Sequence, residues 1–184
     1  MLILFKSLIR PIVEYNCEIW NPYKIKDIVD IEKIQRAFTY RIAGTSGLNY
    51  WERLLQLKIF SLQRRREKMI IITIWKIKNN IIPNSNNVIF KETLRNKACR
   101  AVLPPLPRTS SGLLTRYKNS FAVMGPKLWN CLPLHLTNIQ KLDNFNGLLN
   151  HFIWGLPDKP PLPGYSVENN NSLLNYKHLS KSLY

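Results

Sequence analysis

The chain of 184 residues is 45% hydrophobic, which allows one domain with a real core. Its 27 Lys and Arg residues against 11 Asp and Glu residues give a net charge of +16. That imbalance favours a polyanionic partner, nucleic acid or an anionic membrane face; an ordinary basic domain without a specific ligand is the alternative. No apolar run approaches the ~20 residues of a membrane span, so we expect a soluble chain without a membrane partner. Three widely spaced cysteines predict no disulfide framework and fit an intracellular compartment, nuclear or cytoplasmic.

Three helical patterns come first along the chain. One runs from Leu2 to Trp20 and begins without a capping residue, which suggests a truncated reading frame. Asn49, with Glu52 three residues later, predicts a capping box that starts a short helix. Between these lies the cleanest amphipathic helix, Lys26 to Ile42, whose predicted buried face is Ile28, Ile31, Ile34, Phe38 and Ile42.

The stretch from Ser61 to Lys78 predicts a long helix around which the rest of the chain is organised. Its second half is apolar on almost every face and must be surrounded by other elements, whereas its basic first turns must reach water or an anion. Successive helix residues point about 100° apart, so at most two of three consecutive arginines can face one partner. We interpret this basic cluster as a phosphate site formed by Arg64, Arg65, Arg66 and Lys68.

A second basic segment occupies residues 81–118. Its three closely spaced prolines exclude a continuous helix, and the runs Ala98–Leu103 and Leu113–Tyr117 predict a short hairpin instead. Basic side chains on extended backbone can track a nucleic-acid strand. The candidate backbone contacts here are Arg95, Lys97, Arg100, Arg108, Arg116 and Lys118.

Residues 119–154 predict C-terminal helices that contain the motif Trp-Asn-x-Leu-Pro. Trp129 of this motif and the preceding Phe121 can both face a core. Leu132 and Pro133 end the helix, because the residue before a proline disfavours helical backbone.

These motifs resemble the region after the palm in reverse transcriptases of jockey-like non-LTR retrotransposons. In the N-terminal part the resemblance rests on LILFKSLIRPIVEYNCEIWNPY and LNYWERLLQLKIFSLQRRR, and later on Phe121 followed by Trp-Asn-x-Leu-Pro. It covers most of the chain, from Leu2 to Phe152. Where the family often has a Gly-Asp pair after the basic turn, this chain has Met69-Ile70. The N-terminal matches are Leu8, Arg10, Pro11, Glu14, Tyr15, Trp20, Pro22, Tyr23, Tyr50, Glu52, Arg53, Leu54, Leu57, Leu62, Arg65, Arg66 and Lys76.

The resemblance implies the thumb and post-thumb region, a helical bundle that flanks the polymerase cleft, packs on a palm domain and grips the template–primer duplex. In these reverse transcriptases the catalytic Asp-Asp motif lies upstream of the region that Met1 begins. We therefore expect a fragment that is not an enzyme by itself and has no catalytic residue and no cofactor, although the parent RNA-directed DNA polymerase would need Mg²⁺. The positions of the aspartates agree with this expectation, because a polymerase needs carboxylates held close together to bind two metal ions. Asp27 and Asp30 fit the start of an exposed helix, and the other aspartates are isolated in the sequence.

Metal and small-molecule sites are not expected. Cys131 and His135 lie four residues apart, but a structural zinc site needs four ligands in paired close spacing. Serine, cysteine and histidine occur without a recognisable general base beside them, so nucleophilic catalysis and a small-molecule substrate are not predicted either.

The predicted fold is mainly α, a small helical bundle with an extended or short-hairpin basic segment and a disordered C-terminal tail. The expected parts are a thumb-like bundle (1–80), the basic segment (81–118), C-terminal helices (119–154) and a tail rich in Pro and Asn (155–184).

The predicted function is sequence-indifferent binding of the template–primer duplex or of RNA through the two basic clusters, without catalysis. One alternative is a protein–protein interaction module in which Trp20, Trp51 and Trp154 are hot-spot residues. Another is an inactive translated remnant of the element, which the Met69-Ile70 departure leaves open.

Overall fold

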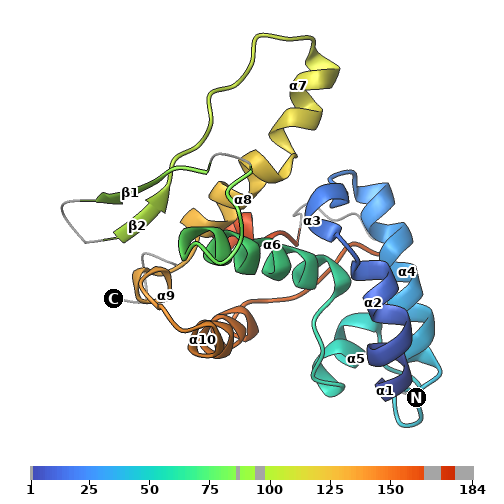
Figure 1. Ribbon diagram of the computed structural model, residues 1–184. Helices are drawn as coiled ribbons and strands as arrows, with labels where there is room; N and C mark the ends of the chain where they lie inside the picture. The colour runs from blue at the N-terminus through green and yellow to red at the C-terminus, as the bar shows by residue number, and fades with distance from the viewer. Residues whose placement is uncertain (1, 86–87, 94–97, 164–170, 177–184) are drawn as a thin grey trace. The chain divides into compact units, whose positions relative to one another are not determined.

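The computed structural model describes residues 2–85, 88–93, 98–163 and 171–176, and these are mostly helical (Figure 1). The predicted mainly-α class is therefore confirmed. The chain divides into two compact units, and the boundary between them falls within α6 (Leu62–Lys78). Unit 1 comprises Met1–Glu67 and Asp158–Ser172, and unit 2 comprises Lys68–Pro157 and Leu173–Tyr184. Within the described residues, no helix is long and apolar enough to cross a membrane.

Before the first turns of α6, unit 1 consists of several short helices and one longer helix, α4. A left-handed backbone at Asn16 (φ 52°) separates the helix that ends at Glu14 from the one that begins at Cys17. A capping box begins α5, as predicted: Asn49 accepts from the Glu52 N–H at 3.0 Å, and Glu52 accepts from the Asn49 N–H at 2.8 Å. The elements are α1 (Leu2–Leu4), the π-helix η1 (Phe5–Ile9), α2 (Arg10–Glu14), α3 (Cys17–Trp20), α4 (Ile25–Tyr40) and α5 (Tyr50–Gln56).

The buried face of α4 differs from the predicted isoleucine face. Ile28 is buried as expected, but Ile34 is exposed, and the buried positions that follow Ile28 are polar. The reason is a buried hydrogen-bond network, in which polar groups replace apolar packing. Tyr50 donates to Glu32, and Gln35 donates to the Phe60 carbonyl. The buried residues of α4 are Ile28, Glu32, Gln35 and Thr39.

The described part of unit 2 contains the apolar part of α6, a two-stranded sheet and further helices. Gly125 of α8 lets that helix approach α6 closely, because a Cβ there would lie 2.7 Å from the Ile74 Cδ1. The elements after α6 are β1 (Phe90–Thr93), β2 (Ala98–Ala101), α7 (Ser111–Lys118), α8 (Phe121–Asn130), α9 (Leu134–Thr137), α10 (Leu142–Trp154) and the 3-10 helix η2 (Leu173–Tyr176).

The predicted hairpin is wrong in its pairing. Ala98–Ala101 does form a strand, but its antiparallel partner is Phe90–Thr93, in the register Phe90 opposite Ala101. The expected second strand, Leu113–Tyr117, lies inside α7. The nearer segment pairs because it closes a much shorter loop, whereas the prolines separate Ala101 from α7.

The Trp-Asn-x-Leu-Pro motif lies at the centre of unit 2. Trp129 is buried, packs beside Phe145 and donates to the Cys99 carbonyl at 2.9 Å. The side chain of Asn130 accepts from the Ala101 N–H at 2.9 Å and donates to its carbonyl at 2.8 Å. The amide thus occupies the position of a neighbouring strand at the end of β2. The motif therefore joins the end of α8 to the sheet.

The described part of the C-terminal segment is packed rather than free. Pro160 and Leu162 are buried in unit 1, and the Trp51 indole donates to the Pro160 carbonyl at 3.0 Å. Leu162 joins an apolar cluster with Tyr50 and Leu54 of α5. The disorder expected over 155–184 thus does not hold for 155–163 and 171–176; residues 164–170 and 177–184 lie outside the described residues.

Candidate nucleic-acid interface

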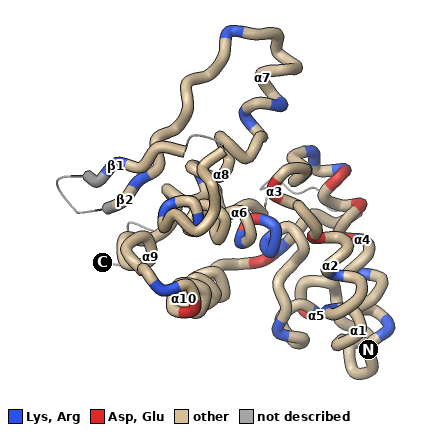
Figure 2. The backbone as a smooth tube through the Cα atoms, viewed as in Figure 1, with Lys and Arg blue, Asp and Glu red and all other residues tan. Residues whose placement is uncertain are grey.

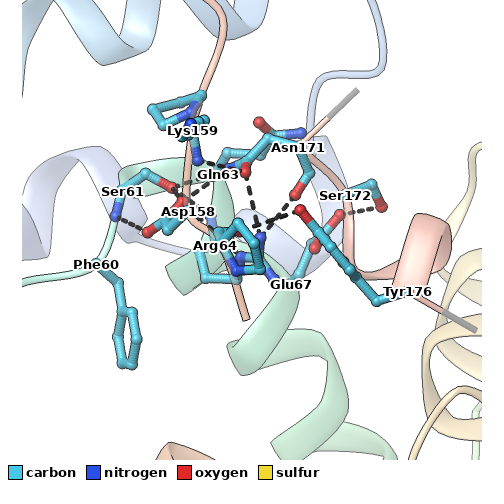
Figure 3. Close-up of polar contacts among 12 residues, drawn as sticks. Phe60, Ser61, Gln63, Arg64, Glu67, Asp158, Lys159, Asn171, Ser172 and Tyr176 are labelled. Atoms are coloured by element: carbon cyan, nitrogen blue, oxygen red, sulfur yellow. Dashed lines mark hydrogen bonds and ion pairs between the residues drawn. The ribbon is translucent and has the colours of Figure 1, made fainter. Parts of the chain in front are cut away.

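The first predicted site residue, Arg64, is fully buried at the start of α6 (Figure 3). Its Nη2 donates to the backbone carbonyl of Asn171 at 3.0 Å and to the Asn171 Oδ1 at 3.2 Å. The Arg64 Nε lies 3.9 Å from the Asp158 Oδ1. Arg64 therefore fastens the C-terminal segment to α6 and is not a surface ligand for phosphate.

Arg65 and Arg66 also have partners inside unit 1. Arg65 forms a bidentate ion pair with Glu14, in which Nη2 donates to Oε2 at 2.8 Å and Nε donates to Oε1. Arg66 is fully buried; its Nε donates to the Asn21 Oδ1 at 3.0 Å, and its guanidinium lies 6.0 Å from the Trp20 ring centre.

The predicted triple-arginine phosphate site is thus corrected. The three side chains do point in different directions, as helical geometry requires, but each reaches a group of unit 1 that is distant in sequence. Burial lowers the pKa of Arg66, although the charge of Glu32 opposes that shift. The last member of the cluster, Lys68, is half-buried at the start of unit 2.

The second basic cluster is divided between structural and exposed positions. Arg100, on β2, donates from Nη1 to the Asn130 carbonyl at 2.7 Å. This hydrogen bond helps to hold the Trp-Asn-x-Leu-Pro motif against the sheet. Arg108, Arg116 and Lys118 are exposed. The two remaining predicted residues, Arg95 and Lys97, lie outside the described residues.

The exposed cations belong to one continuous segment, Leu103–Lys118, which we call the basic arm. It consists of a proline-rich extended stretch followed by α7, in which every residue is exposed or half-buried. The Tyr117 hydroxyl donates to the Pro105 carbonyl at 3.3 Å and ties the helix to the stretch. Figure 2 shows Lys and Arg on the arm without Asp or Glu.

The sequence around the basic arm also carries charges of one sign only. From Thr93 to Leu142 the chain has eight Lys and Arg residues and neither Asp nor Glu. Two of the cations, Arg116 and Lys118, lie in the last turn of α7, where a positive charge also complements the helix dipole. The dipole accounts for their favourable placement on the helix but not for the complete lack of acids in this part of the sequence.

No protein family model, curated protein or solved structure matches this chain. Within the described residues, His, Cys, Asp and Glu do not gather in threes as a metal site requires. Cys131 is buried and His135 is exposed, so the two residues noted in the sequence lie in different environments.

One group of cations was not predicted from the sequence. Lys33 and Arg36 of α4, Arg41 in the turn that follows it and Arg53 of α5 line one pocket. A partial signal for this group exists, because Lys33 and Arg36 follow the three-residue spacing of one helix face, whereas Arg41 comes directly after the helix. The run of consecutive arginines in α6 is the more conspicuous pattern, although it is the helically spaced set that shares a surface.

Proposed function

We propose that this chain is a non-catalytic fragment of a non-LTR retrotransposon reverse transcriptase, corresponding to its thumb and post-thumb region. It binds the template–primer duplex or RNA through phosphate contacts and acts inside the cell, in the nucleus or cytoplasm. The observation that carries the binding function is the basic arm, which exposes Arg108, Arg116 and Lys118 in an acid-free part of the chain. The parent polymerase, not this fragment, would supply the Mg²⁺-dependent chemistry.

The arm suits backbone binding rather than base recognition. Its cations project from exposed α7 and from extended backbone, so they can follow a line of phosphates. Binding of this kind is indifferent to sequence and releases counterions. With about six phosphate contacts in all, affinity falls roughly a thousandfold between 50 and 200 mM salt.

The N-terminal helices support the thumb assignment in a second way. Ile3, Ile12 and Ile19 are 80%, 76% and 78% exposed, so the N-terminal helices of unit 1 present large apolar side chains to solvent. Exposed apolar surface of this kind marks an interaction site. In the proposed parent protein, this surface packs against the palm domain.

The binding function is tested by fluorescence anisotropy with a labelled short DNA duplex. Replacing Arg108, Arg116 and Lys118 by Gln should weaken binding by at least about tenfold, because three phosphate contacts are lost. The matched control removes the same charge from exposed positions of unit 1: Lys6→Gln, Lys24→Gln and Lys26→Gln. Equal losses in both variants would contradict a role for the arm, since only net charge would then matter.

The exposed apolar side chains of the N-terminal helices also favour a second candidate, a protein–protein interaction module. Of the tryptophans proposed as hot spots, Trp20 and Trp154 are exposed, whereas Trp51 packs under Lys159 and donates to Pro160. Complex formation through an apolar interface should survive removal of the arm's charges. Loss of nucleic-acid binding together with retained partner binding would assign the two functions to different surfaces.

A further inference from the structure

Unit 1 contains a pocket of about 430 Å³ between α4 and α5. Its lining comes from one face of α4 and the turn that follows it, with a single contribution from α5. Most of the lining side chains are cationic. The lining residues are Lys33, Arg36, Ala37, Tyr40, Arg41 and Arg53.

Arg53 is held rigidly at the wall of this pocket. Its Nη1 donates to the Leu48 carbonyl at 2.9 Å. Its guanidinium lies 5.5 Å from the ring centre of Tyr40 and 5.7 Å from that of Tyr50. The capping box at the start of α5 fixes the helix that carries it. Rotation of Arg53 away from the pocket would therefore break several contacts at once.

The donor capacity of Arg53 is not used up inside the protein. The residue is only 5% exposed, yet its Nε finds no hydrogen-bond acceptor among the described residues. A buried charged donor without an acceptor is costly, and such groups often mark the place of an ion or ligand.

The remaining charges in the pocket increase that cost. Burial lowers the pKa of Arg53, and the nearby charge of Arg36 lowers it further, against the opposing effect of the Tyr50 and Tyr40 hydroxyls. Lys33 has an acidic partner, Asp30, at 2.6 Å, but that pair lies on the exposed surface of α4. An anion in the pocket would relieve the repulsion between the guanidinium groups.

We propose that this pocket binds a nucleotide, with the phosphate held by Arg36, Arg41 and Arg53 and the base stacked on Tyr40. Guanidinium groups match the geometry of phosphate oxygens through paired hydrogen bonds. Tyr40 is 68% exposed although Arg53 lies over its ring, so it offers surface for an aromatic base. The nucleotide is either free or the phosphorylated end of a strand. This inference does not depend on the basic arm, which belongs to unit 2.

The test uses isothermal titration calorimetry on the whole chain, with AMP, inorganic phosphate and a short 5′-phosphorylated oligonucleotide as probes. The variant Arg36→Gln with Arg41→Gln should weaken AMP and phosphate binding by about tenfold or more, since two charge-assisted contacts are removed. Lys24→Gln with Lys26→Gln removes the same charge from the exposed start of α4 and should leave both affinities nearly unchanged.

A second variant isolates the role of the ring. Tyr40→Ala should weaken AMP binding several-fold and inorganic phosphate binding clearly less, because only AMP has a base to stack, while Arg53 keeps its contacts with Leu48 and Tyr50. The 5′-phosphorylated oligonucleotide shows which form of nucleotide the pocket prefers. Tighter binding than AMP indicates a strand end, and equal binding indicates a free nucleotide. The same oligonucleotide without its 5′-phosphate should bind more weakly, because it lacks the group that the arginines of the pocket hold.

Three results would overturn the proposal: no binding of AMP or phosphate by the wild type at millimolar concentration, equal losses in the two charge variants, or no effect of Tyr40→Ala on AMP. Failure of the pocket is distinguishable from failure of the proposed function. The arm variant should lose duplex binding and keep AMP binding, and duplex binding without any AMP binding would overturn the pocket alone.

Discussion

Asp158 accepts two hydrogen bonds from Ser61, one from its backbone N–H and one from its hydroxyl, each 2.7 Å long. The two residues are 97 positions apart. Ser61 in turn caps α6, because its Oγ accepts from the Arg64 N–H at 3.0 Å. A carboxylate at a helix N-terminus is further stabilised by the helix dipole. A residue expected to lie in a disordered tail thus fixes the start of α6.

Asp158→Ala should lower the free energy of unfolding by about 3 kcal/mol, because it leaves the buried Arg64 without its acidic neighbour and Ser61 without its acceptor. Asp27→Ala, which removes an exposed acid from the first turn of α4, should cost only about 0.5 kcal/mol. Urea denaturation of both variants provides the comparison. Similar costs would mean that the C-terminal segment does not hold α6.

Arg64→Gln and Arg116→Gln each remove one positive charge, but only the first should lower the free energy of unfolding substantially. Arg64→Gln should cost about 2 kcal/mol of stability, because the buried hydrogen bonds to Asn171 and the attraction to Asp158 are lost. Arg116→Gln, at an exposed site on α7, should change stability by no more than about 0.5 kcal/mol. Thermal melts measure the difference, and a stable Arg64→Gln variant would contradict the buried role of Arg64.

Glu32 should make stability depend on pH between about 4.5 and 7. Burial raises the pKa of this carboxyl from 4.5 to about 7, against the hydrogen bonds from Tyr50 and from the Gln63 N–H. The native state therefore binds the proton more tightly than the unfolded chain, so this contribution to stability is complete below about pH 4.5 and is lost as pH rises through 7. The loss is on the order of 3 kcal/mol.

Glu32→Gln removes that titration while keeping one acceptor oxygen at this site and a similar side-chain volume. The stability of the variant relative to the wild type should therefore increase steadily from about pH 5 to about pH 8. Tyr50→Phe removes the donor that lowers the pKa of Glu32 and should shift the transition to higher pH. Denaturation curves across this pH range provide the measurement, and parallel curves for wild type and Glu32→Gln would rule out a buried titrating Glu32.

Gly125→Ala should destabilise unit 2 by about 1 to 3 kcal/mol, because the new Cβ would lie 2.7 Å from the Ile74 Cδ1. Shortening the neighbour with Ile74→Val should recover part of the loss. Gly112→Ala on α7 is the matched control: its Cβ meets open space among the described residues, and it should be neutral or stabilising by up to about 1 kcal/mol. Equal effects of the two alanine substitutions would mean that α6 and α8 are not closely packed.

Local rules predicted those parts of the fold that short segments determine. Asn49 and Glu52 form the capping box because both partners lie within one helical turn. Trp129 is buried, as the motif indicated, because a large aromatic side chain beside apolar residues has few other places in a small domain. The helical class follows from the same short-range patterns.

The same local rules failed at the candidate site, because the partners of its arginines are distant in sequence. The acid that pairs with Arg65 is Glu14, and the groups that bind Arg64 lie beyond residue 157, so a run of three arginines gave no sign of its burial. On α4, the isoleucine spacing indicated an apolar face, whereas Glu32 and Gln35 are buried because Tyr50 and Phe60 supply hydrogen-bond partners. Neither set of partners is visible from spacing along one helix.

The salt dependence of duplex binding tests the central claim most directly. The logarithm of the association constant should fall linearly with the logarithm of salt concentration, with a slope of about −0.9 per phosphate contact. Replacing Arg108, Arg116 and Lys118 by Gln should reduce the magnitude of that slope by about 3, whereas the Lys6, Lys24 and Lys26 control should keep the wild-type slope. A flat salt response in the wild type, or the same slope with and without the three cations of the basic arm, would contradict the account.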